Sequence, residues 1–311
     1  MTRDIFALTV GLLCAGIGGE LFVRAAVGIA AWARVPAGVI GATVAAFATS
    51  TPEVSVAIGA AAAEKPEIAL GDALGSNVVN VALVLGLTLL VGPIVAPRES
   101  TRLDIPFAVL LPLVTITVAL NGTISRIDAA ILLTIFSAWL VLTTLAARRE
   151  RSAAVAVLAE RSHGRSILEM LLGLAFLVAA GRLIVYGARG VGEELGLNAF
   201  VIGATFVAVG TSTPELATTL IARIRGHSEI GLGTIVGSNI YNGGFIIALA
   251  AFIHPIDVNF REAGAAIGFG LAVVALLLNA RGLLRRRLGL LFLTIYIAYV
   301  AVVITAAPPA H

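Results

Sequence analysis

Long apolar stretches alternate with short polar or Pro/Gly-containing breaks along the whole chain. The hydrocarbon core of a bilayer is about 30 Å thick, so a spanning helix needs roughly 20 apolar residues. Stretches of about that length predict ten transmembrane helices and an all-α integral membrane protein. The predicted ranges are 5–33, 38–63, 68–95, 105–120, 127–147, 167–191, 199–222, 230–253, 263–280 and 288–307.

A sequence repeat with a constant offset of 162 residues relates the two halves of the chain. Residues 40–53 recur as residues 202–215 with 10 of 14 positions identical, and residues 71–80 match residues 233–242 in the same register. One register without a gap indicates duplication. Five predicted helices per half is an odd number, so the second half enters the membrane in the opposite orientation. Inverted repeats of this kind are typical of secondary transporters.

The repeat predicts the organisation of the chain. Residues 1–147 form a first five-helix repeat with its signature at 40–86, and residues 166–311 form a second, inverted repeat with its signature at 202–248. Residues 148–165 form a polar linker between them. Broken helices are expected at the midplane of the bilayer, where such repeats place their binding sites.

Composition supports a membrane protein. Hydrophobic residues make up 59% of the chain and charged residues 13%, with a mean hydropathy of +1.02, which leaves too little polar surface for a soluble globule. Most of the 21 basic residues fall in loops on one predicted side, so they indicate topology rather than nucleic-acid binding. We expect a multi-pass protein of the cell membrane with both termini outside and the linker in the cytoplasm. Cys14 is the only cysteine, which excludes a thiolate metal site.

Two glutamates lie within the repeated apolar segments. Glu53 follows Pro52, and Glu215 follows Pro214. A carboxylate at membrane depth indicates an ion pathway. Each proline removes a backbone donor and is expected to break its helix, which frees carbonyl groups at residues 45–50 and 207–212.

Hydroxyl and amide side chains recur at helical spacing around these glutamates. Residues four apart share one helix face, so their oxygens converge. Such pairs are Thr49 with Glu53, Thr211 with Glu215, Ser76 with Asn80, and Ser238 with Asn242. Ca²⁺ takes six to eight oxygen ligands, at about 2.3–2.6 Å, from groups of these kinds. The spacing predicts four helices that direct oxygens at one cation site.

For the other charged residues in or near the predicted helices, we expect structural roles and not ion binding. Glu20 and Arg182 occupy equivalent repeat positions, where they pair with each other or extend toward the membrane interface. Asp72 lies near a predicted helix start, where capping of the helix is the expected role. We expect none of these residues in the ion site.

The peptides Ala48-Thr-Ser-Thr-Pro-Glu53, Gly75-Ser-Asn-Val-Val-Asn80, Gly210-Thr-Ser-Thr-Pro-Glu215 and Gly237-Ser-Asn-Ile-Tyr-Asn242 resemble the two alpha-repeats of the cation/Ca²⁺ exchanger superfamily, most of all its prokaryotic sodium/calcium exchanger branch. The resemblance implies a central cluster of four cation sites in which Glu53 and Glu215 are shared ligands of Ca²⁺ and Na⁺. It implies further ligands at the side chains of Thr49, Thr211, Ser50, Ser212, Ser76, Ser238, Asn80 and Asn242 and at the carbonyls of Ala46 and Ala208.

The chain departs from the family pattern at two positions. Asn242 stands where sodium/calcium exchangers of this type commonly have an aspartate, and Ala48 stands where the motif usually has glycine. Two glutamates balance one Ca²⁺ but not three Na⁺, which leaves the sodium stoichiometry open. An amide still offers an oxygen, so the site is retained.

The resemblance implies a non-enzymatic antiporter that exchanges Ca²⁺ for Na⁺ by alternating access, without a cofactor. An H⁺-coupled Ca²⁺ antiporter is the main alternative, with a glutamate protonating in place of Na⁺ binding. More remote alternatives are an intramembrane hydrolase, which lacks an accompanying motif, and a passive cation channel. The expected partners are the transported ions and the lipid bilayer, with no nucleic acid and no obligate protein partner.

Overall fold

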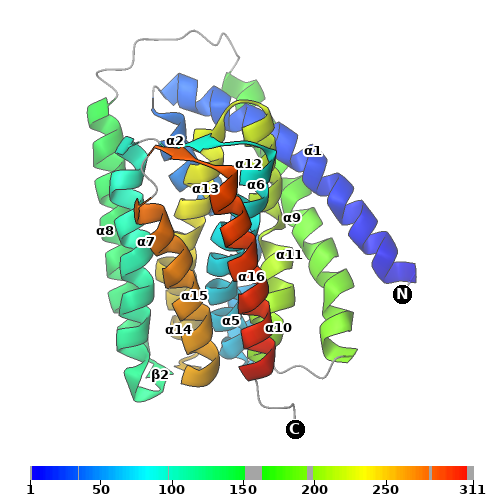
Figure 1. Cartoon of the computed structure of the whole chain (residues 1–311), viewed down its shortest axis with the longest axis vertical. Helices are drawn as coiled ribbons and strands as arrows, with labels where there is room; N and C mark the ends of the chain where they lie inside the picture. The colour runs from blue at the N-terminus through cyan, green and yellow to red at the C-terminus, as the bar shows by residue number, and fades with distance from the viewer. Residues whose placement is uncertain are drawn as a thin grey trace.

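A computed structural model describes residues 2–33, 35–96, 98–150, 163–194, 199–279 and 282–306 as a bundle of helices (Figure 1). Residues 151–162, the greater part of the predicted linker, lie outside these ranges.

The first half contains α1 (Thr2–Ala33), α2 (Ala37–Ile40), α3 (Ala46–Thr49), α4 (Thr51–Ala62), α5 (Pro66–Val78), α6 (Gly86–Val91), α7 (Arg98–Val118) and α8 (Arg126–Glu150). The second contains α9 (His163–Glu194), α10 (Ala199–Ile202), α11 (Ala208–Thr211), α12 (Thr213–Ile224), α13 (Ser228–Ile240), α14 (Ile247–Ile253), α15 (Phe260–Asn279) and α16 (Arg286–Ala306). The π-helical segments η1 (Gly41–Ala45), η2 (Val79–Leu85), η4 (Gly203–Val207) and η5 (Tyr241–Ile246) join helices, and the short 3₁₀ turn η3 is Ala119–Asn121.

The predicted helical character is confirmed, because each of the ten predicted ranges contains helix. Among the described residues, seven helices are long and apolar enough to cross a membrane, and the bent pair Ala37–Thr49 and Thr51–Ala62 makes an eighth. The apolar helical segments Ser166–Ala180 and Ala263–Leu278 are shorter than 18 residues. The protein is therefore a multi-pass membrane protein.

Burial separates the central from the peripheral helices. Within 18-residue apolar windows of Pro66–Val91 and Ser228–Ile253, the buried share is 78% and 83%, whereas in those of Arg126–Ala147 and Arg286–Thr305 it is only 28% and 22%. In Figure 1, α5 and α13 accordingly lie inside the bundle, and α8 and α16 on its outside. The outer helices expose apolar side chains such as Val141 and Ile297, which suits contact with lipid.

The central helices cross through reciprocal backbone contacts between the two halves. A methyl group added to Gly75 would lie against the carbonyl oxygen of Ala204, and one added to Gly237 against the carbonyl oxygen of Ala42. The two contacts are equivalent, because Gly237 lies 162 residues after Gly75 and Ala204 lies 162 residues after Ala42. Small residues allow membrane helices to approach this closely. Such reciprocity is typical of two segments related by a two-fold axis.

Two short ribbons that the sequence did not predict are related in a similar way, with an offset of 162 residues between Ile94 and Ile256 and of 160 between Ile124 and Leu284. Strand β1 (Ile94–Val95) pairs with β4 (Leu283–Leu284), and β2 (Thr123–Ile124) pairs with β3 (Ile256–Asp257), both antiparallel. Figure 1 shows β2 at the opposite end of the bundle from the ribbon of β1 and β4. Next to these ribbons, Arg286 donates to the carbonyl of Leu90 at 2.7 Å, and Arg126 to that of Phe252 at 3.0 Å.

Helices α1 and α9 pack against each other at the edge of the bundle (Figure 1). Their crossing is close at Gly18 and Gly173, where an added methyl group would lie 2.9 Å from the carbonyl oxygen of the other glycine. The suggested pairing of Glu20 with Arg182 is not observed. Glu20 instead accepts hydrogen bonds from Arg24 on its own helix and from Arg225 after α12, both at 2.6 Å. Arg225 directly follows the last residue of α12, which packs against α1, and its guanidinium therefore reaches Glu20.

Candidate functional site: a buried cluster of carboxylates and hydroxyls

Two helix breaks lie at equivalent positions in the halves. Helix α3 ends at Thr49 and α4 begins at Thr51, with a bend of 41°, and α11 ends at Thr211 before α12 begins at Thr213. Ser50 and Ser212 lie in the breaks, with ψ angles of 9° and 6°. The prediction of breaks near Pro52 and Pro214 is confirmed. The irregular residue precedes each proline by two positions because proline fits the first turn of a new helix.

The breaks place Glu53 and Glu215 in the first turns of α4 and α12. Both side chains are fully buried. A helix start stabilises a negative charge through its exposed amide groups and dipole. The breaks therefore place two carboxylates inside the bundle, where the dipole of a helix start partly offsets the cost of burying their charge.

Every residue predicted for the site is buried. This holds for the two glutamates, for the hydroxyl residues Thr49, Thr211, Ser50, Ser212, Ser76 and Ser238, for the amides Asn80 and Asn242, for Ala46 and Ala208, and for Pro52 and Pro214. Burial of so many polar groups in one region is costly unless they bind each other or a ligand.

Glu215 is held by serines from both halves. Ser238 on α13 donates to its Oε1 atom at 2.9 Å, and Ser50 donates to the same atom at 3.4 Å. The hydroxyls of Ser50 and Ser238 are 3.1 Å apart. Thr49 also lies beside this carboxylate. Hydroxyl oxygens from both halves thus converge on Glu215. The predicted pairs four residues apart, Thr49 with Glu53 and Thr211 with Glu215, are not observed, because a helix break lies between each threonine and its glutamate.

Glu53 has a different environment. In the described part of the chain, neither of its carboxylate oxygens has a hydrogen-bond partner. Thr211 lies near it, but the Thr211 hydroxyl donates to Asp72 at 2.9 Å and lies 3.4 Å from the Ser76 hydroxyl. Of the two glutamates, Glu53 is therefore the one whose oxygens make fewer hydrogen bonds to the described part of the protein.

The asparagines lie in the π-helical segments, Asn80 in η2 and Asn242 in η5. Such bulges are frequent at functional sites because they redirect side chains out of the regular helical pattern. Asn80 donates to the Oδ1 atom of Asn239 at 3.0 Å. Within the described ranges, neither polar atom of the Asn242 side chain has a hydrogen-bond partner. The asparagines are equivalent in sequence but not in their contacts.

The carbonyl groups at the breaks are less free than the prolines suggested. The Ala46 carbonyl accepts from the Ser50 amide at 2.9 Å, and the Ala208 carbonyl from the Ser212 amide at 3.0 Å. The expectation of freed carbonyls is wrong for these two, because the helical bonds continue up to the serine in each break. Each carbonyl oxygen keeps a second lone pair that can bind a cation.

Asp72 is a third buried carboxylate that the sequence interpretation missed. It lies within α5, is fully buried, and accepts the hydrogen bond from Thr211. The expected capping role is wrong, since α5 begins six residues earlier at Pro66. A usable signal was present, because Asp72 lies four residues before Ser76 and therefore on the same helix face as the predicted ligands.

The three carboxylates form one electrostatic group. Asp72 and Glu215 both lie close enough to Glu53 to repel it. None of the ion pairs found among the described residues includes these three side chains. Within the same residues, no three His, Cys, Asp or Glu side chains converge tightly enough to hold a metal by themselves. A cation bound here needs hydroxyl, amide and carbonyl oxygens as well, which suits a hard ion.

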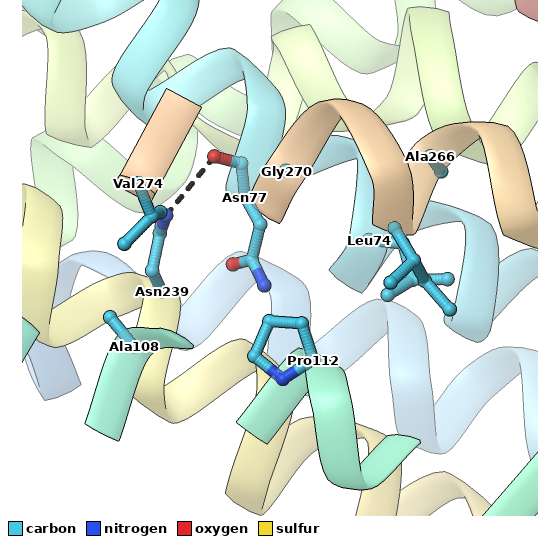
Figure 2. Close-up of a pocket in the computed structure, with 9 residues that line it drawn as sticks. Leu74, Asn77, Ala108, Pro112, Asn239, Ala266, Gly270 and Val274 are labelled. Atoms are coloured by element: carbon cyan, nitrogen blue, oxygen red, sulfur yellow. Dashed lines mark hydrogen bonds between the residues drawn. The ribbon is translucent and has the colours of Figure 1, made fainter. Parts of the chain in front are cut away.

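A small pocket lies between α5, α7, α13 and α15 (Figure 2). Its polar groups are the amides of Asn77 and Asn239, among apolar residues such as Leu74 and Pro112. Figure 2 shows Asn239 donating to the backbone carbonyl of Asn77, at 3.1 Å. Because Asn239 also accepts from Asn80, this pocket supports the position of Asn80 and adds no charge to the site.

Comparison with known proteins agrees with this architecture. A family model described as sodium/calcium exchanger protein matches residues 4–145 and 165–305. The inner membrane protein YrbG of Escherichia coli is 33% identical over 261 residues, which is 81% of this chain and 80% of that protein. The sodium/calcium exchanger MaX1 of Methanosarcina acetivorans is 25% identical over 97% of this chain and 99% of its own.

Solved structures agree as well. The structure of the sodium-calcium exchanger NCX_Mj soaked with 100 mM Na⁺ and 10 mM Sr²⁺ superposes with a TM-score of 0.82 and 29% identity, covering 96% of this chain and 98% of the other. The family match and the structural match, both to exchangers, define a membrane transporter of the cation antiporter class. The chain belongs to the sodium/calcium exchanger family.

Proposed function

We propose that the protein exchanges Ca²⁺ for Na⁺ across the cell membrane by alternating access. The observation that carries the proposal is a pair of fully buried glutamates at equivalent helix starts, surrounded by hydroxyl groups from both halves. Two ions that share the same carboxylates exclude each other, and mutual exclusion is the basis of antiport. An empty, doubly charged site is costly to move through the membrane, which suppresses leak.

In this proposal Glu53 and Glu215 are ligands of both ions. The hydroxyl groups of Thr49, Thr211, Ser50, Ser212, Ser76 and Ser238, the amides of Asn80 and Asn242, and the carbonyls of Ala46 and Ala208 complete the coordination. The free oxygens of Glu53, Glu215 and Asn242 support it, because buried oxygens without a partner favour a bound cation. The names of MaX1 and NCX_Mj as sodium/calcium exchangers support Na⁺ as the counter-ion.

We also propose ten transmembrane helices in two inverted repeats, 1–147 and 166–311, joined by the linker 148–165. The reciprocal contacts of Gly75 and Gly237 support a two-fold relation, and the equivalent ribbons at opposite ends of the bundle support inversion. Helices α1 and α9 would slide together against the rest, since they pack as a pair at the edge.

The orientation has a direct test in a pair of equivalent loops. Lys65 and His227 are 162 residues apart, and each lies between two central helices. In a Cys14→Ala background, a membrane-impermeant maleimide should label Lys65→Cys from outside the cell and His227→Cys only after the membrane is opened. Labelling of both from the same side would rule out inversion, and the reverse pattern would rule out external termini.

Flux through reconstituted protein tests the function. Vesicles loaded with Na⁺ should take up Ca²⁺ when diluted into Na⁺-free buffer, and Glu53→Gln and Glu215→Gln should each slow uptake by about 100-fold or more, since each removes a buried charge that binds the ion. Asp104→Asn is the matched control, because Asp104 is buried in α7 and its partner is the Trp139 indole, at 2.9 Å. Wild-type uptake in the glutamate variants would refute the site.

Coupling to H⁺ is the second candidate, favoured by one observation. Asn242 contributes a neutral amide at a position where an acid would add charge for Na⁺. An outward H⁺ gradient in Na⁺-free vesicles would then drive Ca²⁺ uptake, whereas Na⁺ coupling predicts uptake only with internal Na⁺.

A further inference from the structure

Asp72 breaks the symmetry of the site. Its equivalent in the second half is Thr234, whose hydroxyl donates to the Ile230 carbonyl of its own helix at 2.8 Å and takes no part in the cluster. Asp72 instead reaches across to the other half and accepts a hydrogen bond from Thr211. The first half therefore contributes one more negative charge to the centre than the second half does.

The surroundings of Asp72 are those of a cation-binding group. The side chain is fully buried, and its Oδ2 atom has no hydrogen-bond partner among the described residues. The hydroxyl groups of Ser76 and Thr211 lie beside it, 3.4 Å from each other. A buried carboxylate with neither an ion pair nor full hydrogen bonding carries a large desolvation cost, which a bound cation removes.

The ion that fits here differs from the one between the glutamates. Since no three acidic side chains converge on one point in the described ranges, Asp72 does not complete the coordination of a single ion with Glu53 and Glu215. One carboxylate and two hydroxyls supply a single charge, which matches a monovalent cation.

We propose that Asp72, with Ser76 and Thr211, binds a Na⁺ ion next to the Glu53 and Glu215 site and thereby sets the ion ratio of the exchange. This inference rests on the proposed function. Three carboxylates are balanced by one Na⁺ each, whereas one Ca²⁺ balances only the glutamate pair. Exchange of three Na⁺ for one Ca²⁺ moves one net positive charge per cycle, so its rate depends on membrane voltage.

Asp72→Asn removes the charge and keeps an oxygen that accepts from Thr211. In vesicles with the voltage clamped by K⁺ and valinomycin, wild-type exchange should depend on voltage and steeply on Na⁺. The variant should still exchange, but with lower Na⁺ cooperativity, a Na⁺ half-saturation raised about tenfold or more, and no voltage dependence. Asp104→Asn, a buried change of the same chemistry, should behave as wild type.

The outcomes separate this inference from the proposed function. Absence of Na⁺-driven exchange in the wild type contradicts the function, whereas a normal wild type with an unchanged Asp72→Asn overturns only the role of Asp72. If Asp72→Asn is inactive, the melting temperature of the purified variant is measured with Na⁺ and with Ca²⁺, to show which ion it still binds. Loss of stabilisation by Na⁺ with retained stabilisation by Ca²⁺ supports the assignment, and loss or retention of both overturns it.

Discussion

Glu53 and Glu215 occupy equivalent helix starts and are equally buried, but the protein holds them differently. Glu215 accepts hydrogen bonds from Ser238 and Ser50, whereas Glu53 accepts none in the described structure. The backbones around them match closely, as the reciprocal glycine contacts show. Reciprocal backbone contacts are thus combined with an asymmetric set of polar contacts.

One side chain accounts for the serine partner that Glu53 lacks on α5. By symmetry Ser76 would bind Glu53 as Ser238 binds Glu215, but Ser76 lies against Thr211, which donates to Asp72. With Thr234 in the equivalent place, the other half has no such competitor. One polar difference between the repeats thus changes which partner an equivalent serine and threonine take.

The largest loss of stability is expected at the reciprocal glycine contacts that the two halves share. Gly75→Ala and Gly237→Ala each force a methyl group against a backbone carbonyl, and we expect each to destabilise the fold by about 1–3 kcal/mol or more. Thermal melting in detergent measures this. Gly59→Ala and Gly264→Ala are the controls, since no atom lies within 4 Å of the added carbon, and they should not destabilise. A large effect at only one of Gly75 and Gly237 would contradict the two-fold packing.

A moderate difference in stability is expected between Ser50 and Ser212, whose hydroxyl groups have different partners. Ser50 donates within the Glu215 cluster, whereas the Ser212 hydroxyl has no partner among the described residues. In buffer free of Na⁺ and Ca²⁺, Ser50→Ala should lower stability by about 1 kcal/mol, and Ser212→Ala should leave it nearly unchanged. Equal losses in ion-free melting experiments would show that the asymmetry is absent from the protein in solution.

The smallest loss of stability is expected at two arginines that make similar contacts in the two halves. Arg126 and Arg286 each bond a carbonyl at the end of a central helix of the other half, and both arginines are exposed. Replacement of either by Ala should cost at most about 1 kcal/mol, because exposed charged contacts contribute little. Melting of the two variants should agree within error, and a clear difference would indicate that the two ribbons are not equivalent.

The sequence predicted most of the fold because its signals are local. Apolar length located the helices, and Pro52 and Pro214 located the breaks. The constant offset of the repeat identified which residues share the centre, since equivalent residues take equivalent places when the halves pack. All twelve predicted ligands are buried for this reason.

The remaining features depend on contacts that spacing does not encode. The place of Asp72 in the cluster was missed because Asp72 lies near the helix start predicted at residue 68, which favoured a capping role, and its partner Thr211 is 139 residues away. The π-helical segments around Asn80 and Asn242 left no sequence signal, because apolar residues surround both regular and widened turns. The pairing of Glu20 with Arg225 likewise follows from how α1 crosses the bundle.

Competition between the two ions at the purified protein tests the central claim most directly. Calorimetric titration of Ca²⁺ into the ion-free wild type, repeated at increasing Na⁺, should show one Ca²⁺ site whose apparent affinity falls steadily as Na⁺ rises. Glu53→Gln and Glu215→Gln should abolish this binding, and Asp104→Asn should preserve it. Ca²⁺ affinity that does not change with Na⁺, or that survives in the glutamate variants, would contradict a shared site at Glu53 and Glu215.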